Sequence, residues 1–286
     1  MLEQIKNKHI LIDGDIVKYR CAASAEKTKY LVEFGPDFHK VDTHNEAEKV
    51  LEQCAPEGDG FIWSRKEVQP VEHALQACKT CIDTMVARLD PKDVSIFLSP
   101  PRTFRDTLAT TQPYKGNRNQ PKPKYLKDVE NYLIKGYGAT VADNIEADDE
   151  IGAHLSNEGD GAVSVSIDKD LLQIPGWHYN WVNDRIQRVS PRDGDYFFYT
   201  QMLVGDTTDN IPGLEGYGPK KAKEVLSGAK SRADLCTRVW ECYLIILGDP
   251  SKAAKYFYEQ AGLLWILRSR SIAEGQYKLP DGVELS

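Results

Sequence analysis

Short apolar runs of strand length alternate along this chain with segments of helical periodicity, and this alternation is the feature that most restricts its fold. The runs, all rich in β-branched residues, are His9–Asp13, Val94–Ser99, Gly138–Asp143 and Ala162–Asp168. Apolar residues three and four positions apart predict helices over Val71–Leu89 and Glu146–Ser156. The pattern predicts an α/β fold with a mostly parallel central sheet flanked by helices, in which a site forms at the carboxyl ends of the strands.

Two segments of the chain lack this alternation. Residues 31–70 have weak periodicity, which predicts an irregular or hairpin-like excursion. After about residue 195 the pattern changes to short helical segments joined by glycine turns. We therefore predict an α/β core over residues 1–200, with a basic segment near residues 100–128, and a helical C-terminal region over residues 201–286.

The composition bounds the class of protein. With 286 residues, 41% of them hydrophobic, the chain can bury a substantial core. It has no apolar run of the roughly 18 residues that a membrane span needs, and its N-terminus lacks the apolar segment of a signal peptide. We therefore expect a cytoplasmic location and reduced cysteines. The motif CKTC at Cys78–Cys81 could begin a zinc site, but no second pair with this spacing follows, so buried thiols are favoured.

Charge is distributed unevenly along the chain. The net charge of −7 argues against general binding to nucleic acid, because phosphate affinity depends on lysine and arginine. From Arg102 to Lys127, however, there are seven basic residues and one acid, and from Asp143 to Asp170 there are nine acids and one lysine. Such a pair of segments suits an enzyme that holds a polyanion with cations and metals with carboxylates. The simpler alternative is two solvated faces.

The first apolar run ends on Asp13, and Asp15 follows within the stretch ILIDGDIV. Two phosphate chemistries begin in this way. Asp13 could attack phosphorus as a covalent nucleophile in the hydrolysis of a small phosphate ester, or it could hold Mg²⁺ for cleavage of a nucleic-acid backbone. The rest of the chain must decide between them.

Three further acidic groups, EADDE, SIDKD and GDTTDN, stand at predicted strand ends, helix starts or loops. They contribute Glu146, Asp148, Asp149, Asp168, Asp170, Asp206 and Asp209. Acids also favour helix N-termini and turns, so each group alone has a purely structural interpretation. Gathered on one rim of a sheet, they predict a site for Mg²⁺ or Mn²⁺, since these ions prefer oxygen ligands.

The segment Tyr114–Asp128, YKGNRNQPKPKYLKD, is basic and punctuated by glycine and proline. Its candidate contacts to DNA are Tyr114, Lys115, Arg118, Lys122 and Lys124. The four cations could bind phosphate, and the tyrosine ring could stack on a base. An ordinary flexible basic loop is the alternative.

The segment Asn210–Leu226, NIPGLEGYGPKKAKEVL, places a glycine turn before a lysine-rich helix. Backbone N–H groups at such a turn bind phosphate without reading base sequence. The candidate residues are Gly213, Gly216, Gly218, Lys220, Lys221 and Lys223. This is the pattern of a helix-hairpin-helix, and it is the most specific single signal in the sequence.

The motifs occur in the order ILIDGD, TFRDTL, YKGNR, IEADDEIG, SIDKDLLQI and GDTTDNIPGLEGYGPKKA, over about residues 8–226. With this ordered set the chain resembles the 5′ nuclease superfamily, which includes phage 5′–3′ exonucleases, flap endonucleases and the 5′ nuclease domain of bacterial DNA polymerases. The resemblance implies an α/β core with a helical arch or clamp, and a helix-hairpin-helix that grips duplex DNA.

The resemblance also implies a function, which is hydrolysis of DNA phosphodiesters near a 5′ end or 5′ flap. Two Mg²⁺ ions, which Mn²⁺ can replace, would be held by Asp13 and the seven further acids named above, with Asp13 and Asp168 central to catalysis. Lys115 and Arg118 match the cations that contact the scissile phosphate. Further implied partners are K⁺ at the helix-hairpin-helix and an RNA–DNA hybrid. We expect a monomer in a bacterial or phage-infected cytoplasm.

One departure from the family pattern concerns the second strand. The family commonly ends this strand on a metal-binding aspartate, whereas here Leu98 and Ser99 occupy its end. Our hypothesis is that Asp15 partly compensates as a metal ligand. The basic segment before Leu126 is short, which favours exonuclease action over the threading of flaps.

Two other functions stay open. The motifs DGDIV and GDTTDN also fit phosphatases of the haloacid-dehalogenase type. That interpretation does not account for EADDE or YKGNR, and it requires an apolar strand before Gly205, where YFFYTQMLV predicts a helix. The other alternative is a DNA-binding scaffold that has lost catalysis, which the missing aspartate of the second strand suggests.

Overall fold

The computed structural model describes residues 1–55 and 58–285. Contacts between Cα atoms divide the chain into two compact units. The first unit contains residues 1–16, 85–120 and 137–286, and the second contains residues 17–84 and 121–136. The predicted boundary at residue 200 falls within helix α7 (Pro191–Val204), and the C-terminal helices belong to the same unit as the central sheet.

A six-stranded sheet with the order β6-β5-β1-β7-β8-β9 lies at the centre of the first unit. Its strands are β1 (His9–Asp13), β5 (Asp93–Leu98), β6 (Thr140–Val141), β7 (Ala162–Val165), β8 (Gly176–Asn180) and β9 (Arg185–Val189). Four neighbouring pairs are parallel and the β8–β9 pair is antiparallel, so the predicted fold class is confirmed. The four predicted strands all form, whereas the β8–β9 hairpin was not predicted.

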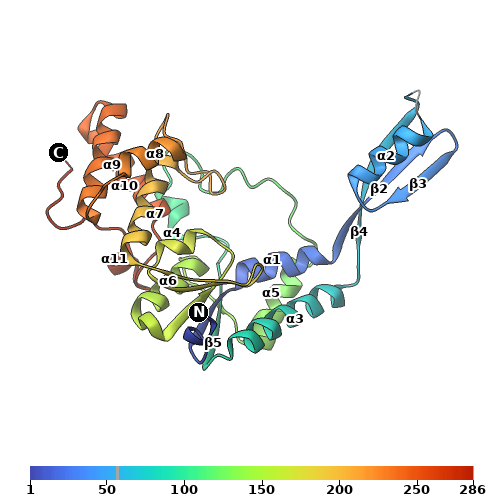
Figure 1. Ribbon diagram of the computed structural model, residues 1–286, viewed down its shortest axis with the longest axis horizontal. Coiled ribbons are helices and arrows are strands. Elements are labelled where there is room, and N and C mark those ends of the chain that lie inside the picture. Colours follow the sequence, from blue (N-terminus) through green and yellow to red (C-terminus); the bar gives the residue numbers. More distant parts are fainter. Residues whose placement is uncertain (56–57, 286) are drawn as a thin grey trace. The chain divides into compact units, whose positions relative to one another are not determined.

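Helices pack on this sheet and form the C-terminal region of the first unit. They are α4 (Phe104–Leu108), α6 (Ala147–Glu158), α7, α8 (Pro219–Leu226), α9 (Arg232–Leu247), α10 (Pro250–Leu264) and α11 (Ile272–Gly275). Figure 1 shows α7, α8, α9 and α10 gathered together. Phe198, Tyr243 and Phe257 are fully buried in the core that these helices share. Helix α6 packs against β1 and β7, which brings its N-terminus to the carboxyl edge of the sheet.

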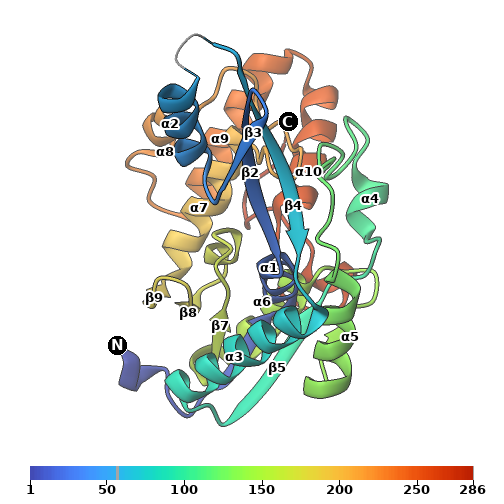
Figure 2. The ribbon, with the colours of Figure 1, turned by 90° about the vertical axis from the view of Figure 1, so that its right-hand side faces the viewer.

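The second unit contains an antiparallel sheet with the order β3-β2-β4, and helix α2 packs on it (Figure 2). The elements here are most of α1 (Gly14–Ser24), β2 (Glu26–Phe34), β3 (Asp37–Val41), α2 (His44–Cys54), β4 (Gly60–Val68), most of α3 (Val71–Leu89) and α5 (Leu126–Tyr137). Helix α3 has the predicted bounds. The sequence predicted an irregular or hairpin-like excursion over residues 31–70, and β2 and β3 do form an antiparallel hairpin. The three-stranded sheet itself was not predicted, because its strands are largely exposed and carry little apolar alternation. Within the described residues, no helix has the length and apolar character needed to cross a membrane.

The turn between α7 and α8 depends on the close approach of two glycines. Gly205 and Gly213 have φ angles of +76° and +66°, and a Cβ atom at Gly213 would lie 2.3 Å from the nitrogen of Gly205. Asp206 and Ile211 exchange two backbone hydrogen bonds of 2.8 Å across this turn. Only glycine allows the two backbone segments to come this close, and the turn thereby fixes the loop that carries Asp206 and Asp209.

We predict that Gly213→Ala lowers the free energy of unfolding by at least about 2 kcal/mol, because the new Cβ meets backbone atoms in a left-handed conformation. Gly218→Ala is the matched control: Gly218 has a φ of −94° and open space around its Cα, so its change should stay within about 0.5 kcal/mol. Urea unfolding of both variants measures these changes. Equal unfolding midpoints for Gly213→Ala and Gly218→Ala would contradict the prediction.

Candidate metal centre

Asp13 lies at the carboxyl end of β1, and the chain around it holds its carboxylate in place. One oxygen accepts hydrogen bonds from the backbone N–H groups of Asp15 (3.1 Å) and Ile16 (3.2 Å), and the other accepts the hydroxyl of Ser166 (2.8 Å). Ser166 follows β7, the parallel neighbour of β1, so both side chains reach the same edge. Burial, followed by the charge of Asp15, raises the pKa of Asp13 to about 7. A cation at this edge would relieve that cost.

The first turn of α6 contributes a second group of acids. One carboxylate oxygen from each of Glu146, Asp148 and Asp149 lies within 4.8 Å of the others. Among the described residues, the buried Oδ1 of Asp148 has no hydrogen-bond partner. Burial, followed by the charges of Asp149 and Glu146, raises the pKa of Asp148 well above its ordinary value. An orphaned, buried carboxylate oxygen of this kind is one that a metal ion would satisfy.

A small cavity of about 20 Å³ brings acids from three elements together. They come from α6, from the short helix η3 (Asp170–Gln173) and from the turn after α7. The acids that line it are Glu146, Asp148, Asp170, Asp206 and Asp209. The space is enough for about one water molecule or ion. These donors are carboxylate oxygens, so the chemistry of the set fits Mg²⁺ or Mn²⁺.

The turn at Tyr114 places predicted phosphate-binding cations against these acids. The hydroxyl oxygen of Tyr114 lies 2.7 Å from a carboxylate oxygen of Glu146 and 2.9 Å from one of Asp209, and its one proton can be donated to either. The ammonium of Lys115 contacts Glu146 and lies 3.6 Å from Asp209, and Arg118 pairs with Asp209. Lys115 also occupies one face of the Tyr114 ring, 4.8 Å from its centroid, so at most the other face is open to a base.

The remaining predicted basic residues of this segment, Lys122 and Lys124, belong to the second unit. The backbone N–H of Lys124 donates to Glu26 at 2.6 Å, and its ammonium lies 5.3 Å from the centroid of the Tyr125 ring. Of the four predicted cations in Tyr114–Asp128, only Lys115 and Arg118 therefore pair with the acids of the first unit.

The predicted glycine turn is present, and its glycines differ in what they contact. The N–H of Gly213 donates to Gln260 (3.0 Å) and its carbonyl accepts the hydroxyl of Tyr256 (2.7 Å), so this amide is not available to a phosphate. Gly216 and Gly218 are exposed, as are the predicted lysines Lys220, Lys221 and Lys223. The ammonium of Lys221 lies 3.6 Å from the centroid of the Tyr217 ring.

Arg105 is a site residue that the sequence analysis missed. It is 2% exposed, and its guanidinium makes a two-pronged ion pair with Asp149 (2.6 and 2.8 Å). It also donates to Glu146 (3.2 Å) and to the carbonyls of Leu263 (3.1 Å) and Trp265 (2.7 Å). Burial would lower the pKa of Arg105, but Asp149 and Glu146 hold it well above its ordinary value. In the sequence, Arg105 is distinguished only as a basic residue within the motif TFRDTL, and local spacing does not show which acid it pairs with.

Asp149 is satisfied by protein groups. Besides Arg105, its two oxygens accept the backbone N–H groups of Glu146 (3.0 Å) and Leu267 (2.9 Å). The same bond to Glu146 closes a capping box at the start of α6. Asp149 therefore holds Glu146 and the buried Arg105 in position. Asp148 differs from it, because its Oδ1 has no hydrogen-bond partner among the described residues.

Glu259 is a second residue that the sequence did not indicate. Its carboxylate accepts hydrogen bonds from the backbone N–H groups of Thr110 and Thr111, both at 2.6 Å, and from both hydroxyls at 2.8 Å. These bonds fasten the segment that leads to Tyr114 onto α10. Glu259, more than 140 positions further along the chain, thereby helps to fix the turn at Tyr114.

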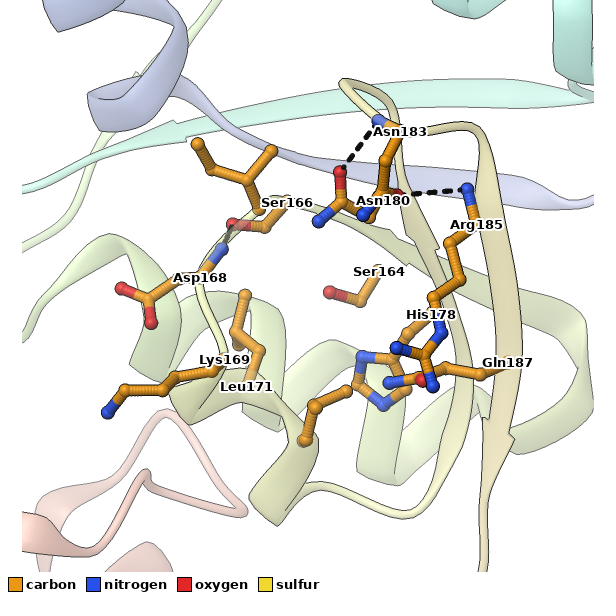
Figure 3. A pocket seen from close by; sticks show the side chains of 12 residues that line it. Ser164, Ser166, Asp168, Lys169, Leu171, His178, Asn180, Asn183, Arg185 and Gln187 are labelled. Atoms are coloured by element: carbon orange, nitrogen blue, oxygen red, sulfur yellow. Dashed lines mark hydrogen bonds between the residues drawn. The ribbon is translucent and has the colours of Figure 1, made fainter.

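A larger pocket of about 220 Å³ opens beside Asp168, and β8, β9 and η3 contribute to its walls (Figure 3). Asn180 and Arg185 line it, and Ser164 points into it. The buried hydroxyl of Ser164 has no hydrogen-bond partner in the described part of the chain. Asp168 thus borders a pocket that polar and apolar side chains line together.

The sequence of the chain is similar to those of named nucleases. No family model matches the chain. The flap endonuclease Xni of Shewanella piezotolerans is 31% identical over 147 residues, which cover 46% of this chain and 57% of that protein. The 5′–3′ exonuclease of Mycoplasma pneumoniae is 27% identical over 239 residues, which cover 76% of this chain and 70% of that protein. The match to the Shewanella protein thus extends over little more than half of its length.

The fold has counterparts among solved structures. The bacteriophage T5 flap endonuclease, crystallised as a complex with DNA and metal ions, superposes with a TM-score of 0.52 and 14% identity, covering 90% of this chain and 98% of that chain. The T5 protein co-crystallised with metal ions gives the same TM-score.

The fold and site define an α/β protein with a carboxylate-rich centre at the edge of a mostly parallel sheet. More particularly, the chain is similar in sequence to proteins named flap endonuclease and 5′–3′ exonuclease, and it shares its fold with the T5 protein. The phosphatase interpretation is not favoured, because helix α7, and not an apolar strand, precedes Gly205.

We predict that Arg105→Ala lowers the free energy of unfolding by about 3–5 kcal/mol, because it leaves Asp149 buried and unpaired. Arg102→Ala removes an exposed arginine three residues away and should cost no more than about 0.5 kcal/mol. In the double variant Arg105→Ala/Asp149→Ala the loss should be smaller than the sum of the two single losses. Additive losses in chemical denaturation would show that the pair does not act as a unit.

Proposed function

We propose that this chain is a divalent-metal-dependent 5′ nuclease that hydrolyses DNA phosphodiesters near a 5′ end. The observation that carries the proposal is the buried, unpartnered oxygen of Asp148 in a cavity ringed by carboxylates, with Lys115 and Arg118 on the same rim. The names of the relatives, a flap endonuclease and a 5′–3′ exonuclease, support this class of activity. The T5 complex with DNA and metal ions supports DNA as the substrate.

The proposed metal ligands are the acids of the sheet edge, and we propose Mg²⁺ as the ion, with Mn²⁺ as a substitute. They are Asp13, Glu146, Asp148, Asp168, Asp170, Asp206 and Asp209. Bound divalent ions supply a water of lowered pKa and neutralise charge on the phosphate. Asp149 does not act as a ligand in this proposal, because protein donors already satisfy both of its oxygens.

The residues of the chain itself have separate tasks. Lys115 and Arg118 pair with Glu146 and Asp209 here, and we propose that they exchange these partners for the phosphate as DNA binds. Tyr114 holds the two acids in place through its hydroxyl. Gly216, Gly218, Lys220 and Lys221 form the exposed start of α8, which we propose contacts the duplex backbone, with K⁺ bound at this turn.

The biological setting is the least specific part of the proposal. The relatives are bacterial and the superposed structures come from a phage, which supports a bacterial or phage-infected cytoplasm. We propose that the chain acts as a monomer and that an RNA–DNA hybrid can replace the DNA duplex.

Cleavage of a 5′-labelled DNA duplex with a single-stranded 5′ flap, run beside its blunt duplex, tests the proposal. We expect Mg²⁺-dependent release of short products from the 5′ end, and a loss of at least 100-fold in rate for Asp168→Asn. The control Asp160→Asn removes an exposed acid that precedes β7, at the opposite end of the strand, and should cleave normally. Binding of the duplex without any cleavage would instead establish the scaffold interpretation.

Asp15 allows a separate test of the missing aspartate of the second strand. The register pairs Asp13 with Phe97, so Leu98 and Ser99 lie at the end of β5. The carboxylate of Asp15 accepts the backbone N–H of Ser99 at 3.1 Å, which places its charge at that strand end. We therefore propose that Asp15 supplies part of the negative charge that the missing aspartate would contribute.

We predict that Asp15→Asn raises the Mg²⁺ concentration needed for half-maximal cleavage by about 10-fold, because the amide can keep the bond to Ser99 but carries no charge. A Mg²⁺ titration of the cleavage rate measures this. Unchanged activity and Mg²⁺ affinity would refute the compensating role of Asp15.

A further inference from the structure

His9, His154 and Glu158 form a second cluster of metal-binding side chains, away from the acidic edge. His9 begins β1, and Glu158 ends α6 one turn after His154. One candidate ligand atom from each lies within 4.8 Å of the others. Asp13 stands at the other end of β1, roughly 13 Å along a strand of that length. The cluster is therefore separate from the carboxylates proposed to bind Mg²⁺.

The three side chains face one another closely. Nδ1 of His9 lies 2.9 Å from Oε2 of Glu158, and Nδ1 of His154 lies 3.0 Å from Oε1 of the same carboxylate. Four ligands that surround a zinc ion at its usual bond lengths lie about 3.3 Å from one another. Small side-chain shifts would therefore suffice to admit an ion. The side chains keep 18%, 30% and 26% of their surface exposed, which leaves a path from solvent.

Neighbouring residues hold the two imidazoles in place. Nε2 of His9 lies 2.8 Å from the hydroxyl of Ser95, on the adjacent strand β5. When Nε2 donates its proton to that hydroxyl, the unprotonated Nδ1 faces the carboxylate of Glu158, and a cation between them relieves the repulsion of the two lone pairs. The ring of Phe97 packs against His154, with 5.2 Å between the ring centroids.

We propose that His9, His154 and Glu158 bind one Zn²⁺ ion, with water as the fourth ligand. Two imidazoles and one carboxylate form a donor set that favours zinc over Mg²⁺, whereas the acidic edge offers oxygen donors alone. The bound ion ties the start of β1 to the end of α6. These are the two elements whose opposite ends carry Asp13 and Glu146, so the ion stabilises the framework on which the acidic edge is built.

Titration of the metal-free full chain with Co²⁺ at pH 7.5, in the presence of excess Mg²⁺, tests the proposal. We expect one equivalent to bind with the visible absorption of a four-coordinate site, and stoichiometric Zn²⁺ to displace it. His154→Ala should weaken binding at least 100-fold, and Ser95→Ala, which keeps all three ligands, about 10-fold. His73→Ala, an exposed histidine on α3, and Asp168→Asn should both bind as the unaltered chain does.

The same experiment has outcomes that overturn the proposal. No uptake by the unaltered chain would mean that the two imidazoles only hydrogen-bond to Glu158, and equal uptake by the His154→Ala variant would place the ion elsewhere. Thermal unfolding guards against a variant that merely fails to fold: Zn²⁺ should raise the melting temperature of the unaltered chain and of Asp168→Asn but not of Glu158→Gln. The measurement uses no DNA, so its result is independent of nuclease activity.

Discussion

The buried ion pair between Arg105 and Asp149 is the interaction on which the rest of the site depends. It takes two charges out of water, and such a pair is tolerated only where further hydrogen bonds satisfy the remaining donors and acceptors. Here the backbone carbonyls of Leu263 and Trp265 and the N–H groups of Glu146 and Leu267 do this. The pair thereby joins α4, the start of α6 and the segment after α10. The position of Glu146 and Asp148 follows from that junction.

Protein cations compensate part of the negative charge of the site. Burial would raise the pKa of Glu146, but Arg105 and Lys115 hold it below its ordinary value. Asp148 lies near the same two cations, but burial and the charges of Asp149 and Glu146 outweigh them and raise its pKa well above its ordinary value. Burial and the charge of Asp15 raise the pKa of Asp13 to about 7. The acids thus divide into a set that protein cations keep ionised and a set whose pKa values stay raised. The second set is where an added divalent cation gains most, because it removes the cost of burial that these carboxylates bear.

Much of the fold and part of the site could be predicted from the sequence. The buried parallel strands and α3 have strong periodicity, and acids at strand ends must meet at one edge of a parallel sheet. The sequence could not reveal Arg105 or Glu259, because each acts on residues far along the chain that local spacing does not report. For the second unit the sequence predicted no more than an irregular or hairpin-like excursion, since the exposed strands of its sheet lack apolar alternation. The part played by Gly213 depends on the approach of Gly205, which only the folded turn creates.

Ser99 shows how one departure from the family pattern is built into this site. Its hydroxyl accepts the backbone N–H of Ala147 at 2.9 Å, and its own N–H donates to Asp15. The strand end therefore helps to cap α6 and to hold an acid from α1. A carboxylate at this position would bring another negative charge to an edge where Asp13 and Asp148 already have raised pKa values. Asp15 already brings an anion to this strand end, where the backbone N–H of Ser99 holds its carboxylate.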